Sequence, residues 1–322
     1  MKGRTALYAV VALAWLGVAP AAAQTPAPQA PTLQERLGYP ATARLLIIHA
    51  DDFGMAHAVN RAIIDALEHG WVTSASVMVP CPWFPEVAAW ARAHPDADLG
   101  IHLTLTSEWT TYRWGPLSGR DKVRSLLDAQ GYLPLLAEGA AKQDKPKEAE
   151  RELRAQIDFA RAAGVHLTHL DTHMGTVLET EQLFNLYRAL GKSYGLPVLL
   201  ERQGEHGGAQ APVWARAAMN EAPLDLVVQM GHSVPADQWL DTYKKILAPL
   251  PPGVYQLIVH LAYDDDEFQG ATADHPDWGA AWRQHDLDVV GSDEFRQFLK
   301  EQGFQLITWK ELAKAQAMTA PR

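Results

Sequence analysis

Short apolar runs that alternate with amphipathic segments predict a chain of parallel strands and helices. The first run, Leu45 to Ile48, suits a strand buried on both faces. After Gly54, apolar residues recur at helical spacing until Gly70, which is typical of a helix end. The same alternation continues to residue 309. Further strands are predicted over 72–79, 98–105, 166–170, 197–200, 224–230, 254–261 and 304–309, and further helices over 84–94, 147–164, 180–194, 236–248 and 292–302.

This pattern predicts an α/β fold. Seven or eight βα units in one domain favour a distorted (β/α) barrel of the TIM type, and an open doubly wound sheet is the alternative. We expect the barrel over residues 41–316, followed by a tail over 317–322. Residues 106–145 break the rhythm with an aromatic, turn-rich segment after a strand end, where binding loops usually lie.

The amino-terminal segment predicts export. Two basic residues precede an apolar run over residues 6–18, and three alanines end at Ala23. These features predict a signal peptide over 1–23, cut after Ala23, and a Pro/Ala-rich leader over 24–40. We therefore expect a periplasmic or secreted protein with no membrane span once the signal is removed, and the sequence leaves a homodimer open. The formal net charge of −10 argues against a nucleic-acid partner.

Acidic residues and histidines recur where predicted strands end. Asp51 and Asp52 follow the first strand, His102 interrupts the strand over 98–105, His173 follows the strand over 166–170, and His260 lies near the end of the strand over 254–261. One buried histidine is more often a core residue than a ligand. Because the carboxyl ends of parallel strands meet at one end of the fold, the recurrence favours a functional site. Alternation along an extended segment predicts that the two aspartates point to opposite sides, one toward a metal and one toward a substrate.

These residue types suit metal-assisted hydrolysis. One carboxylate and two imidazoles bind a divalent ion, Mg²⁺ or Zn²⁺, and leave open positions for water and substrate. The metal would lower the pKa of its bound water, a second carboxylate would take a proton from that water, and a histidine would protonate the leaving group. Serine-based hydrolysis lacks support because no GxSxG motif is present.

Four segments, LLIIHADDFG, VNRAIIDALEHGWVTSASVMV, GIHLTLT and HLDTH, resemble the YdjC-like carbohydrate deacetylase family, and the similarity continues to GFQLITWKEL near residue 312. The resemblance implies a distorted (β/α) barrel that uses a divalent metal to remove the N-acetyl group from an amino sugar or glycan. It further implies that Asp52, His102 and His173 hold the metal, that Asp51 is the general base, and that His260 is a candidate general acid.

The sequence departs from the family in two places. Met174 and Gly175 follow His173, where the family often has another histidine two residues on. Residues 260–263 read HLAY, where the family usually reads HPGY. Neither departure removes an expected ligand, but both put a chitooligosaccharide substrate in doubt. The expected substrate-binding residues are Trp109, Tyr112 and Trp114 in the aromatic segment, and His232 and Asp264 near strand ends.

Two other functions stay open at this point. One is an exported carbohydrate-binding barrel without catalytic activity. The other is a metal-dependent hydrolase of a different bond, such as an ester.

Overall fold

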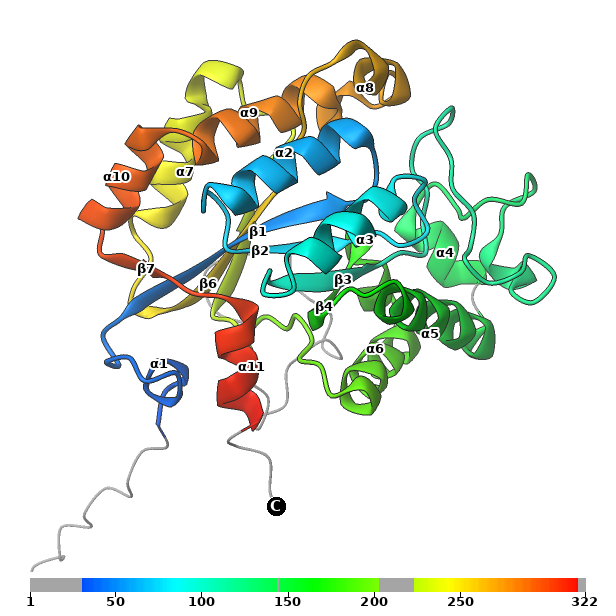
Figure 1. The fold of residues 1–322 in the computed structure, drawn as a ribbon, viewed down its shortest axis with the longest axis horizontal. Helices are drawn as coiled ribbons and strands as arrows, with labels where there is room; N and C mark the ends of the chain where they lie inside the picture. The colour runs from blue at the N-terminus through cyan, green and yellow to red at the C-terminus, as the bar shows by residue number, and fades with distance from the viewer. Residues whose placement is uncertain (1–30, 144, 203–222, 318–322) are drawn as a thin grey trace, which may run out of the picture. The chain divides into compact units, whose positions relative to one another are not determined.

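The computed structural model describes residues 31–143, 145–202 and 223–317, and the predicted signal peptide lies outside these residues. Within the unit that starts at Thr32, all strand pairs are parallel, and helices surround the strands (Figure 1). None of the helices in the described stretches is long and apolar enough to cross a membrane.

Seven parallel strands form one sheet in the order β4-β3-β2-β1-β6-β5, with β7 paired to the start of β1. Two isolated bridges lie beyond the edge strand β4. Leu170 of β4 pairs with Val198, and Glu201 pairs with Leu224, which lies just before β5. The distorted barrel is therefore confirmed, and the predicted strand over 197–200 is reduced to these bridges. The strands are β1 (Arg44–Phe53), β2 (Ser74–Val77), β3 (Leu99–Leu103), β4 (Leu167–Thr172), β5 (Leu226–Gln229), β6 (Gly253–Val259) and β7 (Phe304–Leu306).

Most predicted helices are present, and the clearest omission is α9 (Ala280–Val290). This helix buries Arg283 and Asp286 together with its apolar residues, so its sequence lacks a clear polar face. It packs beside α2, α7 and α10 (Figure 1). The helices are α1 (Leu33–Arg36), α2 (His57–Glu68), α3 (Phe84–Ala93), α4 (Ala137–Gln143), α5 (Pro146–Ala162), α6 (Glu181–Tyr194), α7 (Trp239–Leu247), α8 (Asp266–Ala271), α9, α10 (Asp293–Glu301) and α11 (Trp309–Ala317).

Alternate side chains of β1 face two different environments. Leu46 and Ile48 belong to the larger apolar core, whereas Leu45 and Ile47 belong to a smaller cluster that also contains Trp309. His49 and Asp51 continue the second series toward the carboxyl end of the strand. This face of β1 therefore changes from apolar to ionisable side chains along its length.

His169 of β4 occupies a tightly packed place within the barrel. Its ring stacks on Trp309 with 4.5 Å between centroids and an interplanar angle of 12°. On β3, a Cβ added to Gly100 would lie 2.3 Å from His169 Nε2. Glycine is therefore the residue that leaves room for this imidazole.

We predict that Gly100→Ala lowers the free energy of unfolding by about 1–3 kcal/mol, because the added methyl group must displace an imidazole that is stacked on Trp309. Gly270→Ala is the matched control, since no atom lies within 4 Å of a Cβ added there. Urea unfolding of both variants measures the effect. An unfolding midpoint of Gly100→Ala equal to that of the wild type would contradict it.

Candidate metal and catalytic site

A β-bulge at the carboxyl end of β1 brings two adjacent carboxylates to the same cluster. Asp51 and Asp52 lie between Ala50 and Phe53, whereas one residue lies between their partners on β2. Asp52 has a φ of 69°, in the left-handed region that non-glycine residues seldom adopt. The prediction that the two side chains point to opposite sides is wrong, because the bulge interrupts the alternation.

The two carboxylate oxygens of Asp52 have different surroundings, since one accepts a hydrogen bond and the other does not. Its Oδ2 accepts a hydrogen bond of 2.7 Å from Nη1 of Arg283, which is buried on α9. Its Oδ1 is buried and has no hydrogen-bond partner among the described residues. Burial raises the pKa of Asp52, but Arg283 and the neighbouring imidazoles outweigh burial and hold this pKa well below its usual range. Asp52 is therefore ionised, with one free oxygen directed into the cluster.

His102 presents one ring nitrogen to that free oxygen. Its Nε2 lies 3.4 Å from Asp52 Oδ1, while its Nδ1 lies 2.7 Å from Asp171 Oδ1 on the adjacent strand β4. The other oxygen of Asp171 contacts Nε2 of His49 at 2.9 Å. Asp171 thus orients His102 so that Nε2 faces Asp52. Burial lowers the pKa of His102, but Asp171 and Asp51 outweigh burial and raise it well above its usual value.

His173 follows β4 and is oriented in the same way. Its Nε2 lies 2.9 Å from Glu108 Oε2, and its Nδ1 lies 3.2 Å from Asp52 Oδ1. Burial lowers the pKa of His173, but Glu108 and Asp52 outweigh burial and raise it to about 9. Glu108 lies in the aromatic segment after β3, so this segment contributes a residue that positions the cluster.

The residues fit a divalent metal ion. Asp52, His102 and His173 each offer one ligand atom, and these three atoms lie within 4.8 Å of one another. Each imidazole has its second nitrogen on a carboxylate, which is the usual arrangement around metal-bound histidines. The free oxygen of Asp52 lacks a hydrogen-bond donor among the described residues, and a cation between the three atoms would satisfy it.

Asp51 and His260 lie next to this cluster. Asp51 Oδ1 is 3.2 Å from His49 Nε2, and its Oδ2 is 3.8 Å from His102 Nε2 and 3.9 Å from His260 Nε2. Burial lowers the pKa of His260 to about 4, so its imidazole is neutral at pH 7. The backbone N–H of His260 donates to Asp286 Oδ2 at 2.9 Å.

The expected substrate-binding residues lie in different environments. Trp109 is 0% exposed and Trp114 is 3% exposed, so neither ring offers a free face to a sugar. Tyr112 is half-buried, and its hydroxyl donates to the carbonyl oxygen of Met55. The Trp114 ring lies 6.3 Å from the His173 ring between centroids, so Trp114 packs beside this histidine.

His232 and Asp264 are both exposed. His232 lies 5.9 Å from Trp278 between ring centroids, and Trp278 in turn lies 6.1 Å from His260. Asp264 Oδ1 accepts a hydrogen bond of 2.9 Å from Gln269 Nε2 of α8.

Sequence reasoning missed the residues that position the cluster. Arg283 and Asp286 lie on the unpredicted helix α9, and Glu108 lies in a loop with little periodicity. Asp171 lies in the segment HLDTH, but its contacts with His102 on β3 and with His49 on β1 become apparent only in the tertiary structure.

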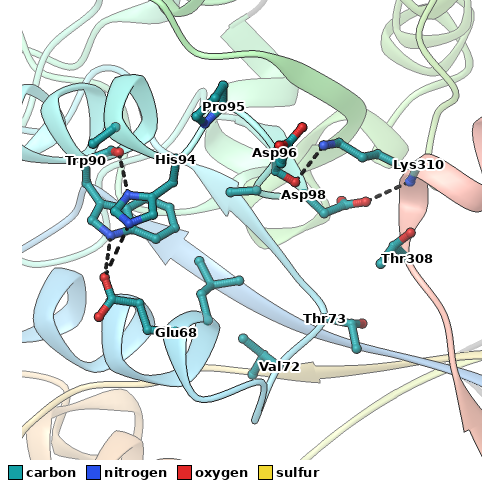
Figure 2. A pocket seen from close by; sticks show the side chains of 13 residues that line it. Glu68, Val72, Thr73, Trp90, His94, Pro95, Asp96, Asp98, Thr308 and Lys310 are labelled. Atoms are coloured by element: carbon teal, nitrogen blue, oxygen red, sulfur yellow. Dashed lines mark hydrogen bonds and ion pairs between the residues drawn. The ribbon is translucent and has the colours of Figure 1, made fainter.

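A cavity of about 470 Å³ lies at the amino ends of the strands, away from this cluster (Figure 2). Figure 2 shows Trp90, His94 and Glu68 on one side and Asp98 and Lys310 on the other. These polar groups bond to one another or to nearby backbone, as in the 2.9 Å bond from Trp90 Nε1 to Glu68. The cavity therefore does not contain the candidate catalytic groups.

Comparisons with known proteins identify a matching family and several similar proteins. A family model described as YdjC-like protein matches residues 45–301. A carbohydrate deacetylase of Thermus thermophilus is 36% identical over 286 residues, which cover 88% of this chain and 98% of that protein. A chitooligosaccharide deacetylase of Klebsiella pneumoniae is 26% identical and is matched over 99% of its length and 84% of this chain.

The crystal structure of a candidate cellobiose-phosphate cleavage protein from Enterococcus faecalis has a similar fold. The TM-score is 0.71 at 24% identity, and the match covers 84% of this chain and 99% of that one. This likeness supports the barrel assignment.

The buried carboxyl of Asp286 predicts a pH-dependent contribution to stability. Burial raises the pKa of Asp286 from 3.8 to about 6. Hydrogen bonds from Tyr243, Trp239 and His260 act in the opposite direction but do not outweigh burial. Because the pKa is higher in the folded protein, the folded state favours the protonated form. The contribution of Asp286 to the free energy of unfolding is therefore fully present below pH 4 and is lost as the pH rises through 6. The total loss is about 3 kcal/mol.

We therefore expect the free energy of unfolding of the wild type, relative to Asp286→Asn, to fall by up to about 3 kcal/mol between pH 4 and pH 7. Urea unfolding of both proteins at the two pH values measures this difference. A difference that stays constant or grows with pH would contradict the prediction.

Proposed function

The chain belongs to the YdjC-like protein family, and from this membership and the site geometry we propose that it is a metal-dependent carbohydrate deacetylase. The reaction would hydrolyse the N-acetyl group of an amino sugar or glycan to acetate and a free amine. The observation that carries the proposal is the convergence of Asp52, His102 and His173 beside a second carboxylate, Asp51, and a further histidine, His260.

Asp52 Oδ1, His102 Nε2 and His173 Nδ1 would hold the metal, since these atoms converge and are not used by the positioning carboxylates. A bound divalent ion would supply Lewis-acid chemistry, polarising the acetyl carbonyl and making a water molecule more acidic. Asp171 and Glu108 would keep the two imidazoles in the tautomers that binding requires.

Asp51 and His260 would move the protons. Asp51 would take a proton from the water that attacks the acetyl carbon, and His260 would deliver a proton to the nitrogen as the C–N bond breaks. His260 is neutral at pH 7, because burial lowers its pKa to about 4. It would therefore receive its proton during the reaction, and the 3.9 Å between its Nε2 and Asp51 Oδ2 would allow that transfer through one bridging water.

We also propose that the protein is exported to the periplasm or secreted. The basic start, the apolar run over residues 6–18 and the alanines before residue 24 support this proposal. An exported deacetylase would meet envelope or environmental glycans as substrates.

Acetate release tests the proposed function. We expect the purified protein to release acetate from N-acetylated amino sugars or their oligomers, and we expect dialysis against a chelator to abolish release until Mg²⁺ or Zn²⁺ is restored. An enzymatic acetate assay over a panel of N-acetylated and O-acetylated glycans measures this. Binding of these glycans without any acetate release would instead indicate a non-catalytic carbohydrate-binding protein.

Two variants of the adjacent aspartates serve as controls for the assigned roles. Asp52→Asn should lose metal, measured by elemental analysis, whereas Asp51→Asn should keep metal and lose turnover by about 10²-fold or more. If Asp51→Asn lost the metal and Asp52→Asn retained it, the two roles would have to be exchanged.

His260→Ala should affect amide and ester substrates differently. An amine leaves an amide only after it is protonated, whereas p-nitrophenolate leaves an activated ester without a proton donor. We expect kcat to fall at least about 10²-fold on an N-acetyl sugar and much less on p-nitrophenyl acetate, with metal content unchanged. Equal losses on both substrates, or loss of metal, would assign His260 a structural or ligand role.

A further inference from the structure

Trp278 lies beside the candidate proton donor, in the connection between α8 and α9. It ends the short 3₁₀ helix η5 (Pro276–Trp278), and its indole centroid is 6.1 Å from the His260 ring and 5.9 Å from the His232 ring. We propose that Trp278 is the platform on which the substrate's acetamido-bearing sugar ring stacks. This inference rests on the proposed deacetylase function and adds a determinant of its substrate class.

Accessibility distinguishes Trp278 from the other tryptophans around the site. Trp109 packs near Arg283, Trp114 near His173 and Trp282 near His260, and their exposures are 0%, 3% and 5%. Trp278 is only partly buried, so part of its indole is open to a ligand. Of these four rings, it is the one with free surface next to the candidate catalytic histidine.

The same contacts that build the candidate metal site hold Trp278 in place. Arg283, which donates to Asp52, also donates through Nε to the carbonyl oxygen of Trp278 at 2.9 Å. Trp282 backs the indole with 4.7 Å between ring centroids. Asp274 in the same connection accepts a hydrogen bond of 2.8 Å from the backbone N–H of Thr110. The platform is therefore pre-organised, which lowers the entropy lost when a ligand binds.

The position suits a sugar more than a linear amide. Pyranose rings present flat apolar C–H faces that pack well on indole, and their hydroxyls need polar neighbours. The exposed His232, 5.9 Å from Trp278 between ring centroids, supplies such a neighbour. His260 lies 6.1 Å from Trp278, so a sugar ring stacked on the indole would have the candidate proton donor close by. Stacking would thus orient the scissile bond as well as bind the ring.

Two substitutions separate the aromatic face from simple apolar packing. Trp278→Leu keeps an apolar side chain without a flat face, whereas Trp278→Phe keeps a smaller aromatic face. With a chitooligosaccharide or N-acetylglucosamine substrate that the wild type hydrolyses, we expect Trp278→Leu to lower kcat/KM about tenfold or more, mainly through KM, which corresponds to about 1.4 kcal/mol. Trp278→Phe should stay within about threefold of the wild type.

A control variant and three further measurements complete the experiment. The matched control is Trp71→Leu, since Trp71 is also half-buried but stacks on His69 just before the amino end of β2, and it should leave kcat/KM unchanged. Metal content and thermal unfolding of each variant should match the wild type. Calorimetric titration of the same sugar into Asp51→Asn, with and without Trp278→Leu, should show the affinity loss without turnover.

The outcomes separate this inference from the proposed function. Wild-type acetate release that is unaffected by Trp278→Leu, or reduced equally by Leu and Phe, would overturn the platform and leave the deacetylase proposal standing. A wild type that releases no acetate from any sugar would overturn both.

Discussion

The hydrogen bond between Arg283 and Asp52 is the interaction on which the site depends. Asp52 lies in a β-bulge with a φ of 69°, a backbone state that costs about 1–3 kcal/mol for a non-glycine residue. A buried guanidinium at 2.7 Å offsets this cost with a charge-assisted bond and, together with the neighbouring imidazoles, stabilises the buried carboxylate. Because Arg283 uses one carboxylate oxygen, the other stays free for the cluster.

Carboxylates around His102 and His173 set the orientation and the pKa of both imidazoles. Asp171 and Glu108 each hold the ring nitrogen that faces away from the centre, so that His102 and His173 direct the opposite nitrogen toward Asp52. The pKa values of both histidines rise above the usual range because these acids outweigh burial. The same negative potential that retains protons on the imidazoles favours a divalent cation, which would displace those protons on binding.

Several parts of this arrangement could be predicted from the sequence. The buried β1, the strand-end positions of Asp51, Asp52 and His102, and the parallel barrel all follow from local patterns of apolar and polar residues. Helix α9 could not be predicted, since it buries polar residues on the faces that a surface helix would expose. The burial of Trp109, which is 0% exposed, could not be predicted either, because the turn-rich segment has little apolar periodicity.

The sequence by itself therefore determined the strands, most helices and the end of the barrel at which ionisable residues collect, because these features depend on short-range periodicity. Only the tertiary structure decided which side chains meet. The bulge that turns both aspartates toward His102, and the pairing of Asp52 with Arg283 across 231 residues of chain, depend on strand register and helix packing. Such long-range contacts leave no periodic trace in the sequence, since a buried charge is stabilised by its partner and not by its neighbours along the chain.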